Sequence, residues 1–308
     1  MRLRVIPIPV LAVLLIAACG QTGSGTAEVG ETTVKLISAG NEPYRELRYV
    51  FEPGRTDIVY MDIAVVISQT VLDQPLSDET IPTIRLTVQV DSREITPEGD
   101  LRYEVKIVGS ELLPTPGFSP QQIAAANEVM VQMVGMYGGG LITPLGVGRE
   151  TVMYPPPGAS EEIRQMLGEV TTELEDMSQP FPEEPIGQGA MWQVTGPVEA
   201  EGLKMTQSAT FWLVSLDETT GELNVTIQQT AEPHEWAHPQ AVAAGETWNV
   251  TALEGSGFGQ IFFDLGRPFP YSEGETTTTV SFTRQNQSGA RQRRTMTTRA
   301  NVKLGPGL

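Results

Sequence analysis

Residues 84–91 read IRLTVQVD, residues 101–107 read LRYEVKI, and PEGD at 97–100 lies between them. In both stretches an apolar residue alternates with a polar or charged one, which is the period-two pattern of a strand that buries one face. The turn residues of PEGD favour an antiparallel hairpin between the two strands. This segment therefore predicts a fold built on antiparallel sheet.

Strand patterns recur along most of the chain. Residues 223–227 and 296–302 repeat the alternation, and turn signals separate the runs. Residues 58–67 and 211–216 are apolar at almost every position, which predicts strands that are buried on both faces.

Two segments carry helical signals instead. The segment 119–137 has an N-cap serine, a proline at the first helical position, apolar residues nearly all round, and three glycines at 138–140 to end it. In 160–177 apolar residues recur at helical spacing, with glutamates on the other side. A short hairpin at about 141–153 would connect the two helices.

The expected fold class is mainly β, with antiparallel sheets and two inserted helices. The sheets form either one curved, half-barrel-like body or two packed β subdomains. The proline-rich stretch at 180–185 is either a domain boundary or a strap across one body. We divide the chain into residues 1–19 (an export signal with its cysteine), 20–31 (a tether), 32–180 (a β-rich region with two helices) and 181–308 (an all-β region).

The first 19 residues have a positive start, an apolar run of about 14 residues, and IAAC at 16–19. The run is short of the ~20 residues that a membrane-spanning helix needs, and its small-residue end is typical of a cleaved export signal. IAAC resembles the bacterial lipobox, in which the cysteine receives a diacylglycerol and the chain is cut just before it. Because Cys19 is the only cysteine of the chain, we predict a protein tethered to a membrane by lipid on Cys19.

Residues 20–31 are small and polar, and they predict a flexible tether with an end-to-end distance of roughly 20 Å. Residue 20 is glycine and not aspartate. By resemblance to exported lipoproteins, this predicts a place in the cell envelope, at the periplasmic side of the outer membrane if the host has two membranes.

The net charge of −18 makes nucleic acid an unfavourable partner, because an acidic surface repels phosphate backbones. Basic residues nevertheless gather near the C-terminus. They form either a docking patch for an anionic partner or one solvated face of a terminal hairpin. The basic residues in question are Arg284, Arg291, Arg293, Arg294, Arg299 and Lys303.

From residue 182 the chain reads PEEPIGQGAMWQV, a pattern of acid, proline, aliphatic residue, Gly-x-Gly-Ala and tryptophan. It resembles a family of bacterial envelope lipoproteins for which no activity is established, and the likeness covers about the last 125 residues. The two glycines, Gly187 and Gly189, predict positive-φ turns or close backbone approach, and Trp192 is expected to fill the core. The matching residues are Pro182, Glu184, Pro185, Ile186, Gly187, Gly189, Ala190 and Trp192.

The order of strands, helices and strands also resembles half-barrel carriers of the bacterial envelope, in which helices plug the concave side of a curved sheet. That resemblance implies a hydrophobic or amphiphilic ligand and makes 119–137 the plug, since methionine adapts to irregular apolar partners. The alternative is that this helix simply packs on a sheet. The candidate ligand contacts are Ile123, Met130, Met133 and Val134.

The stretch HEWAH, residues 234–238, contains both histidines of the chain and matches the H-E-x-x-H motif of zinc metalloproteases. In those enzymes the histidines bind zinc from one helix face and the glutamate, here Glu235, is the general base. Proline at 233 and at 239 argues against a helix, because the residue before a proline avoids the α region. We expect a surface loop with Trp236 tucked inward and one helical turn at 239–244.

Other catalytic templates are missing: the chain has no G-x-S-x-G elbow and no P-loop. We therefore expect no catalytic residue and no cofactor. The first hypothesis is a non-enzymatic envelope lipoprotein that binds a hydrophobic or amphiphilic ligand. The second is an envelope protein that binds another protein through strand edges and loops. The third is a zinc hydrolase, or a non-catalytic metal site, using His234 and His238.

Overall fold

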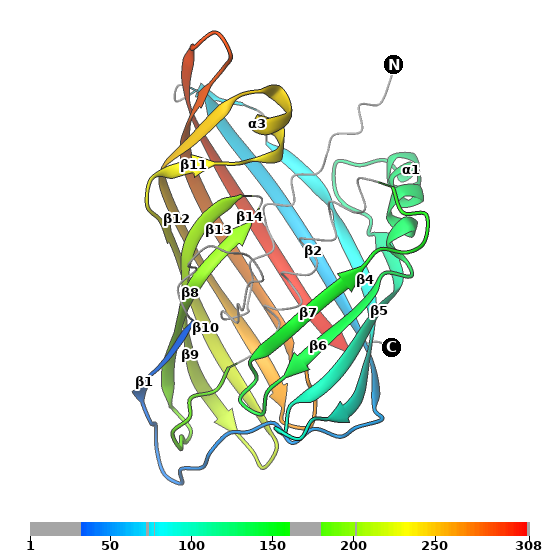
Figure 1. Ribbon diagram of the computed structural model, residues 1–308, viewed down its shortest axis with the longest axis vertical. Coiled ribbons are helices and arrows are strands. Elements are labelled where there is room, and N and C mark those ends of the chain that lie inside the picture. Colours follow the sequence, from blue (N-terminus) through cyan, green and yellow to red (C-terminus); the bar gives the residue numbers. More distant parts are fainter. Residues whose placement is uncertain (1–31, 72–73, 77, 161–179, 201, 307–308) are drawn as a thin grey trace.

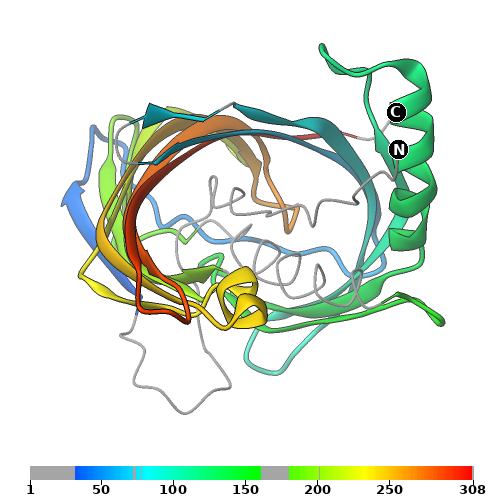
Figure 2. The ribbon, with the colours of Figure 1, turned by 90° about the horizontal axis from the view of Figure 1, so that it is seen from above.

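The computed structural model describes residues 32–71, 74–76, 78–160, 180–200 and 202–306. The predicted fold class is confirmed, because the chain forms one large antiparallel sheet that is not closed, with two helices. Figures 1 and 2 show that this sheet is strongly curved, so that it has a concave and a convex face.

The hydrogen-bonded order of the strands places β1 and β7 at the two ends of the sheet. From one end to the other the strands are β1 (Thr33–Ser38), β8 (Met191–Ala200), β9 (Leu203–Leu216), β10 (Thr220–Ala231), β12 (Thr247–Asp264), β13 (Tyr271–Gln285), β14 (Arg291–Pro306), β2 (Thr56–Val71), β4 (Glu79–Ile95), β5 (Leu101–Leu112), β6 (Tyr137–Ile142) and β7 (Gly148–Tyr154). Two short strands lie off this path, β3 (Gln74–Pro75) on β2 and β11 (His234–Trp236) on β12.

The range 32–180 and the range 181–308 both contribute strands to this one sheet. β14 pairs with β2 from Pro306↔Val59 to Arg294↔Val71, and β1 pairs with β8. These two pairings join the ranges edge to edge. Of the two architectures that the sequence left open, the chain therefore forms the single curved sheet.

The buried face of the sheet is its concave face. The ring of Phe181 packs 6.2 Å from Trp192 of β8 and 5.2 Å from Phe263 of β12. β9 and β10 lie between those strands, so the two would be about 14 Å apart in a flat sheet. One ring can contact both only from inside the curve, which also fixes the side on which alternate residues of every strand lie.

The alternation predicted for 84–91 and 101–107 is confirmed, with Leu86, Val88 and Val90 buried in β4. The prediction that 58–67 and 211–216 are buried on both faces is wrong. Only alternate residues of β2 are buried, and Trp212 of β9 is 49% exposed. The outward residues lie on the convex face, which no other layer of the described chain covers.

Helix α1 (Pro120–Met130) begins as predicted, with a capping box between Ser119 and Gln122. The prediction that it continues to residue 137 is wrong. A 3₁₀ turn, η1 (Val131–Met133), follows, and the three glycines at 138–140 lie inside β6. They fit there because a Cβ on Gly139 would lie 2.2 Å from the carbonyl oxygen of Tyr103 in the neighbouring strand.

Helix α1 lies beside β5 and not across the middle of the concave face (Figure 2). β6 pairs only with residues 101–106 of β5, and α1 covers the edge that continues beyond them. There the side chain of Asn127 accepts a hydrogen bond from the backbone N–H of Leu112 at 2.6 Å. The hairpin predicted at 141–153 is confirmed as β6 and β7, whereas the helix predicted at 160–177 lies outside the described residues except for residue 160.

The lower end of the sheet in Figure 1 is crossed by the segment that joins β1 to β2. Backbone hydrogen bonds connect Asn41 to Gln188, Arg45 to Ile186, and Val50 to Leu265. Leu47 of this segment is fully buried. The segment thus ties together strands that are far apart in the sheet.

Candidate functional site

An aromatic cluster fills the lower end of the concave face. Phe181 contacts Tyr49 and Trp192, and the ring of Trp192 stacks on Phe211 at 5.4 Å. The indole N–H of Trp192 donates to the carbonyl of Pro180 at 3.0 Å. Because all these rings are buried, this end of the molecule is sealed by packing.

The Gly-x-Gly-Ala motif is part of the same seal. Gly189 has a φ of +84°, and a Cβ on Gly187 would lie 1.9 Å from the carbonyl oxygen of Asn41. Both predictions for these glycines are confirmed, as is the burial of Trp192. The motif therefore brings the segment after β1 against the start of β8.

The opposite end of the sheet, at the top of Figure 1, carries β11 and helix α3 (Pro239–Ala244). Trp236 is buried there and packs edge-on against Trp248 and Phe282, while His238 stacks on Trp248 at 4.7 Å. The predicted inward tryptophan and the helical turn at 239–244 are both confirmed.

The stretch HEWAH is therefore not a helix, and its two histidines have separate surroundings. Nε2 of His234 accepts from the backbone N–H of Lys204 at 3.1 Å, and its Nδ1 lies 2.8 Å from the carbonyl of Glu232. His238 is buried in the tryptophan cluster. Within the described ranges, no group of three or more His, Cys, Asp or Glu residues is arranged to hold a metal ion.

The four candidate ligand contacts do not share one environment. Met130 and Met133 are buried, and Ile123 packs partly buried against the same core. Val134 is 38% exposed. The structure thus brings three of the four against the core at the β5 edge and leaves the fourth on the surface.

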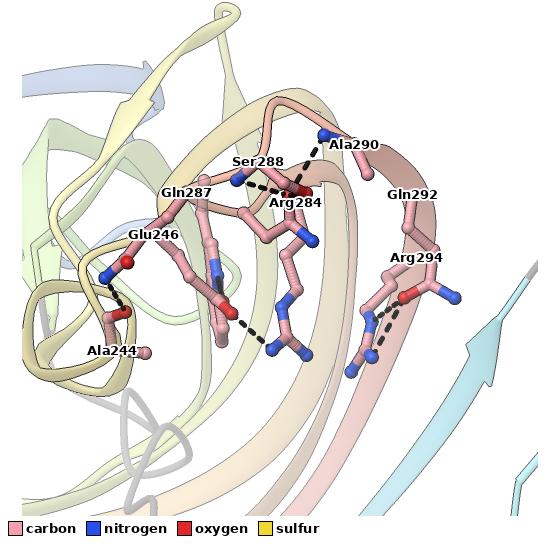
Figure 3. A network of polar contacts seen from close by, with 10 residues as sticks. Ala244, Glu246, Arg284, Gln287, Ser288, Ala290, Gln292 and Arg294 are labelled. Atoms are coloured by element: carbon pink, nitrogen blue, oxygen red, sulfur yellow. Dashed lines mark hydrogen bonds and ion pairs between the residues drawn. The ribbon is translucent and has the colours of Figure 1, made fainter.

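Two of the basic residues near the C-terminus, Arg284 and Arg294, lie on the concave face at the α3 end. Arg294 is paired with Phe282 across β13 and β14, and Phe282 is buried. Arg284 lies two residues beyond Phe282 on β13, so it shares this face. Figure 3 shows the two guanidinium groups on neighbouring strands below the β13–β14 turn.

The charges in this cluster do not balance. Arg284 donates to the carboxylate of Glu246, which also accepts from the indole of Trp248 at 3.1 Å. Arg294 instead bonds a neutral acceptor, since its Nε and Nη2 donate to Oε1 of Gln292 at 3.1 and 3.0 Å. Among the residues that the structure describes, the ion pairs leave Arg294 without a carboxylate partner.

The surroundings shift two pKa values at this end. The hydrogen bond from Arg284, and a smaller contribution from Trp248, hold the pKa of Glu246 below its usual range. Burial, and then the charge of Arg284, lower the pKa of Arg294, and the charge of Glu246 opposes them without outweighing them. The cationic form of Arg294 is therefore less stabilised than it would be in water or beside an anion of its own.

Another arginine, Arg267 near the lower end, provides a contrast. It lies 3.4 Å from Asp57 and 3.4 Å from Asp264, and it donates to the hydroxyl of Tyr271. A cavity beside it, lined by Asp57, Arg267 and Tyr271 among others, has a volume of about 10 Å³, which is room for one water molecule. Arg55 also pairs with Asp57, at 2.8 Å, so two arginines face two carboxylates and the cluster is charge-balanced, as expected of structural ion pairs.

The sequence contains a signal for the inward arginines that counting charges misses. In β14, Arg294 has the same parity as Met296, Thr298 and Ala300, all of which are buried. Arg291, Arg293, Arg299 and Lys303 have the opposite parity and are exposed. Only that second group forms the solvated face expected of a terminal hairpin.

Large apolar side chains are exposed on the convex face near one end of the sheet. Met191 of β8 is paired with Trp212 of β9, and Phe258 and Phe262 point outward from β12. Each of the four is more than a third exposed. Exposed apolar side chains that lie on neighbouring strands are typical of surfaces that meet a partner.

Cys19 and the tether at 20–31 lie outside the described residues. In the part of the chain that is described, no helix is both long and apolar enough to cross a membrane. The chain matches no protein-family model, and no curated protein is significantly similar to it.

Proposed function

We propose that this protein is a non-enzymatic lipoprotein of the cell envelope that binds a hydrophobic or amphiphilic ligand on the concave face of its sheet. The observation that carries the proposal is the form of that face. It is mostly apolar, with Gln207 and Gln229 buried and hydrogen-bonded to each other among its apolar residues. It is closed by aromatic packing at one end and ends at two arginines at the other.

The open form of the sheet gives a route to this face. β1 and β7 are the ends of the strand order and are not hydrogen-bonded to each other. Moving these edges apart breaks no strand pairing. At the lower end it would break the backbone hydrogen bonds from Tyr49 to Pro144 and from Phe181 to Leu145, so the edges part at less cost toward the α3 end.

The membrane tether rests on the sequence alone. Lipid on Cys19 and a flexible segment at 20–31 would keep the sheet near a bilayer. An anchored protein with an apolar interior is suited to hold a lipid-like molecule that is poorly soluble in water.

Native mass spectrometry tests the proposal on protein from residue 20 onward, which contains every described residue. We expect one co-purified amphiphile per chain, at a mass that accurate-mass analysis assigns to a lipid class. A bare chain after purification without detergent contradicts ligand binding. One zinc per chain, lost in His234→Ala, with no amphiphile bound, contradicts the proposal in favour of a metal site.

A second candidate function is the binding of an envelope protein through the convex face, which the exposed Met191, Trp212, Phe258 and Phe262 favour. Trp212→Ser should then abolish co-purification of a defined partner and leave the bound amphiphile unchanged. If the substitution changes neither, the convex face has no such role.

A further inference from the structure

The excess positive charge at the α3 end extends the proposed function. Arg284 and Arg294 lie on adjacent strands, on the face that holds the core, and Glu246 neutralises only one of them. The chain as a whole has a net charge of −18. A half-buried cation that forms no ion pair with a carboxylate of the described residues, in so acidic a protein, is an arrangement that an anion from outside would stabilise.

The groups around Arg294 leave its guanidinium suited to a second acceptor. Within the described ranges only Nε and Nη2 have an acceptor, and both donate to Oε1 of Gln292. An arginine has five N–H groups arranged for two-point contact with a carboxylate or phosphate. Gln292 therefore orients the guanidinium without neutralising it.

Directly inward from the arginines the surface is apolar. Phe282 and Trp248 stack at 4.9 Å beside them, and Val280 and Met296 continue the concave face along β13 and β14. A ligand bound at the guanidinium groups would therefore extend its remaining atoms over apolar side chains. This is the order of polarity within an anionic amphiphile, with a charged head and an apolar tail.

We infer that Arg294, with Arg284 and Gln292 beside it, is an anion-binding site for the carboxylate or phosphate headgroup of the bound amphiphile. That the ligand has an apolar tail rests on the proposed function. That its headgroup is an anion rests on this cluster of side chains alone. The same chemistry would also accept a free phosphate ion, so the test separates the two sources.

The test compares Arg294→Gln with Arg293→Gln, in protein from residue 20 onward. The control removes the same charge from the adjacent residue, which is exposed on the convex face. Titration calorimetry measures three probes: dodecyl phosphate below its critical micelle concentration, dodecanol, and inorganic phosphate. Far-UV circular dichroism checks that each variant keeps its sheet.

We expect the unmodified protein and Arg293→Gln to bind dodecyl phosphate at least tenfold more tightly than dodecanol. In Arg294→Gln that preference should fall by about tenfold, or about 1.4 kcal/mol, with dodecanol binding unchanged. Equal loss in both variants, or no loss in either, would overturn the inference.

The probes distinguish failure of the head site from failure of the proposed function. Binding of both chain probes with no effect of Arg294→Gln leaves the ligand-binding function standing and removes the head site. Binding of inorganic phosphate as tight as that of dodecyl phosphate, and lost in Arg294→Gln, keeps the anion site and contradicts an amphiphilic ligand.

Discussion

Tyr49 and Tyr103 are both buried, but their hydroxyl groups are treated differently. The hydroxyl of Tyr103 lies 3.2 Å from Oγ1 of Thr151. That of Tyr49 has no hydrogen-bond partner among the described residues, and burial followed by the charge of Asp264 raises its pKa. A buried hydroxyl without a partner costs free energy that its removal recovers.

We therefore predict that Tyr49→Phe raises the free energy of unfolding by about 0.5–1 kcal/mol, whereas Tyr103→Phe lowers it by about 1 kcal/mol. Urea unfolding followed by tryptophan fluorescence measures both. A loss of stability in Tyr49→Phe equal to that in Tyr103→Phe would mean that the Tyr49 hydroxyl has a partner in solution.

Gly187 offers a second prediction, because its missing Cβ is what lets Asn41 approach. Gly187→Ala should lower the free energy of unfolding by about 2–3 kcal/mol, since the new methyl group would overlap a carbonyl oxygen. Gly305→Ala is the control, because a Cβ there meets nothing within 4 Å. Equal stability of the two variants in urea would contradict the close approach.

Glu246 connects stability to pH. Its folded-state pKa lies below the ordinary value of a glutamate, so its ionised form stabilises the fold above the unfolded pKa. That contribution is lost as the pH falls through the lower, folded-state pKa. The unfolding free energies of the natural protein and Glu246→Gln should differ between pH 5 and 7 and converge as the pH falls below the folded-state pKa. Glu254→Gln, at an exposed position, is the control; a pH-independent difference for Glu246→Gln would contradict the ion pair.

The sequence predicts on which face of β14 Arg294 lies, but it does not predict which charges surround it. The alternation of Met296 and Ala300 indicates its face, but the charge count near the C-terminus groups it with Arg293. Burial of an arginine is uncommon, so composition favours the solvated interpretation. The charge imbalance itself needs Glu246 and Gln292 in place, and these come together only through strand pairing.

At the scale of the element, α1 acts as a cover for the free edge of β5. Asn127→Ala removes the acceptor for the Leu112 amide, so that amide should exchange with solvent about tenfold faster. Hydrogen exchange read by nuclear magnetic resonance measures it at the single residue. Gln121→Ala, an exposed change on the same helix, should leave Leu112 unaffected; an equal acceleration there would show that the helix frays as a whole.

Helices and strands could be predicted where residues close in sequence determine them. They could not be predicted where contact with a neighbouring strand determines them. The start of α1 and the turn at 239–244 depend on serine and proline within a few residues, and both were predicted. The glycines at 138–140 normally end a helix, but here they belong to β6, where Tyr103 of the neighbouring strand leaves no room for a Cβ. The almost entirely apolar run at 58–67 reflects a convex face that tolerates apolar residues, and not burial on both sides.

At the scale of the whole molecule, the strand order joins the two halves of the chain into one curved sheet. The mainly β class follows from alternation, but the contact of β14 with β2 does not, because more than 200 residues separate the paired positions. Long-range pairing of this kind depends on which edges meet after local hairpins form. It decides that the two ranges share one concave face.

The proposed function depends on ligand binding at the concave face, so the decisive test locates the acyl chain of a bound ligand. A fatty acid with a diazirine on its tail is bound to the protein and photolysed, and the labelled residues are identified by peptide mass spectrometry. We predict labels on inward residues such as Val280, Leu253 and Met296. Labels confined to Trp212, Phe258 and Phe262 on the convex face would contradict the account.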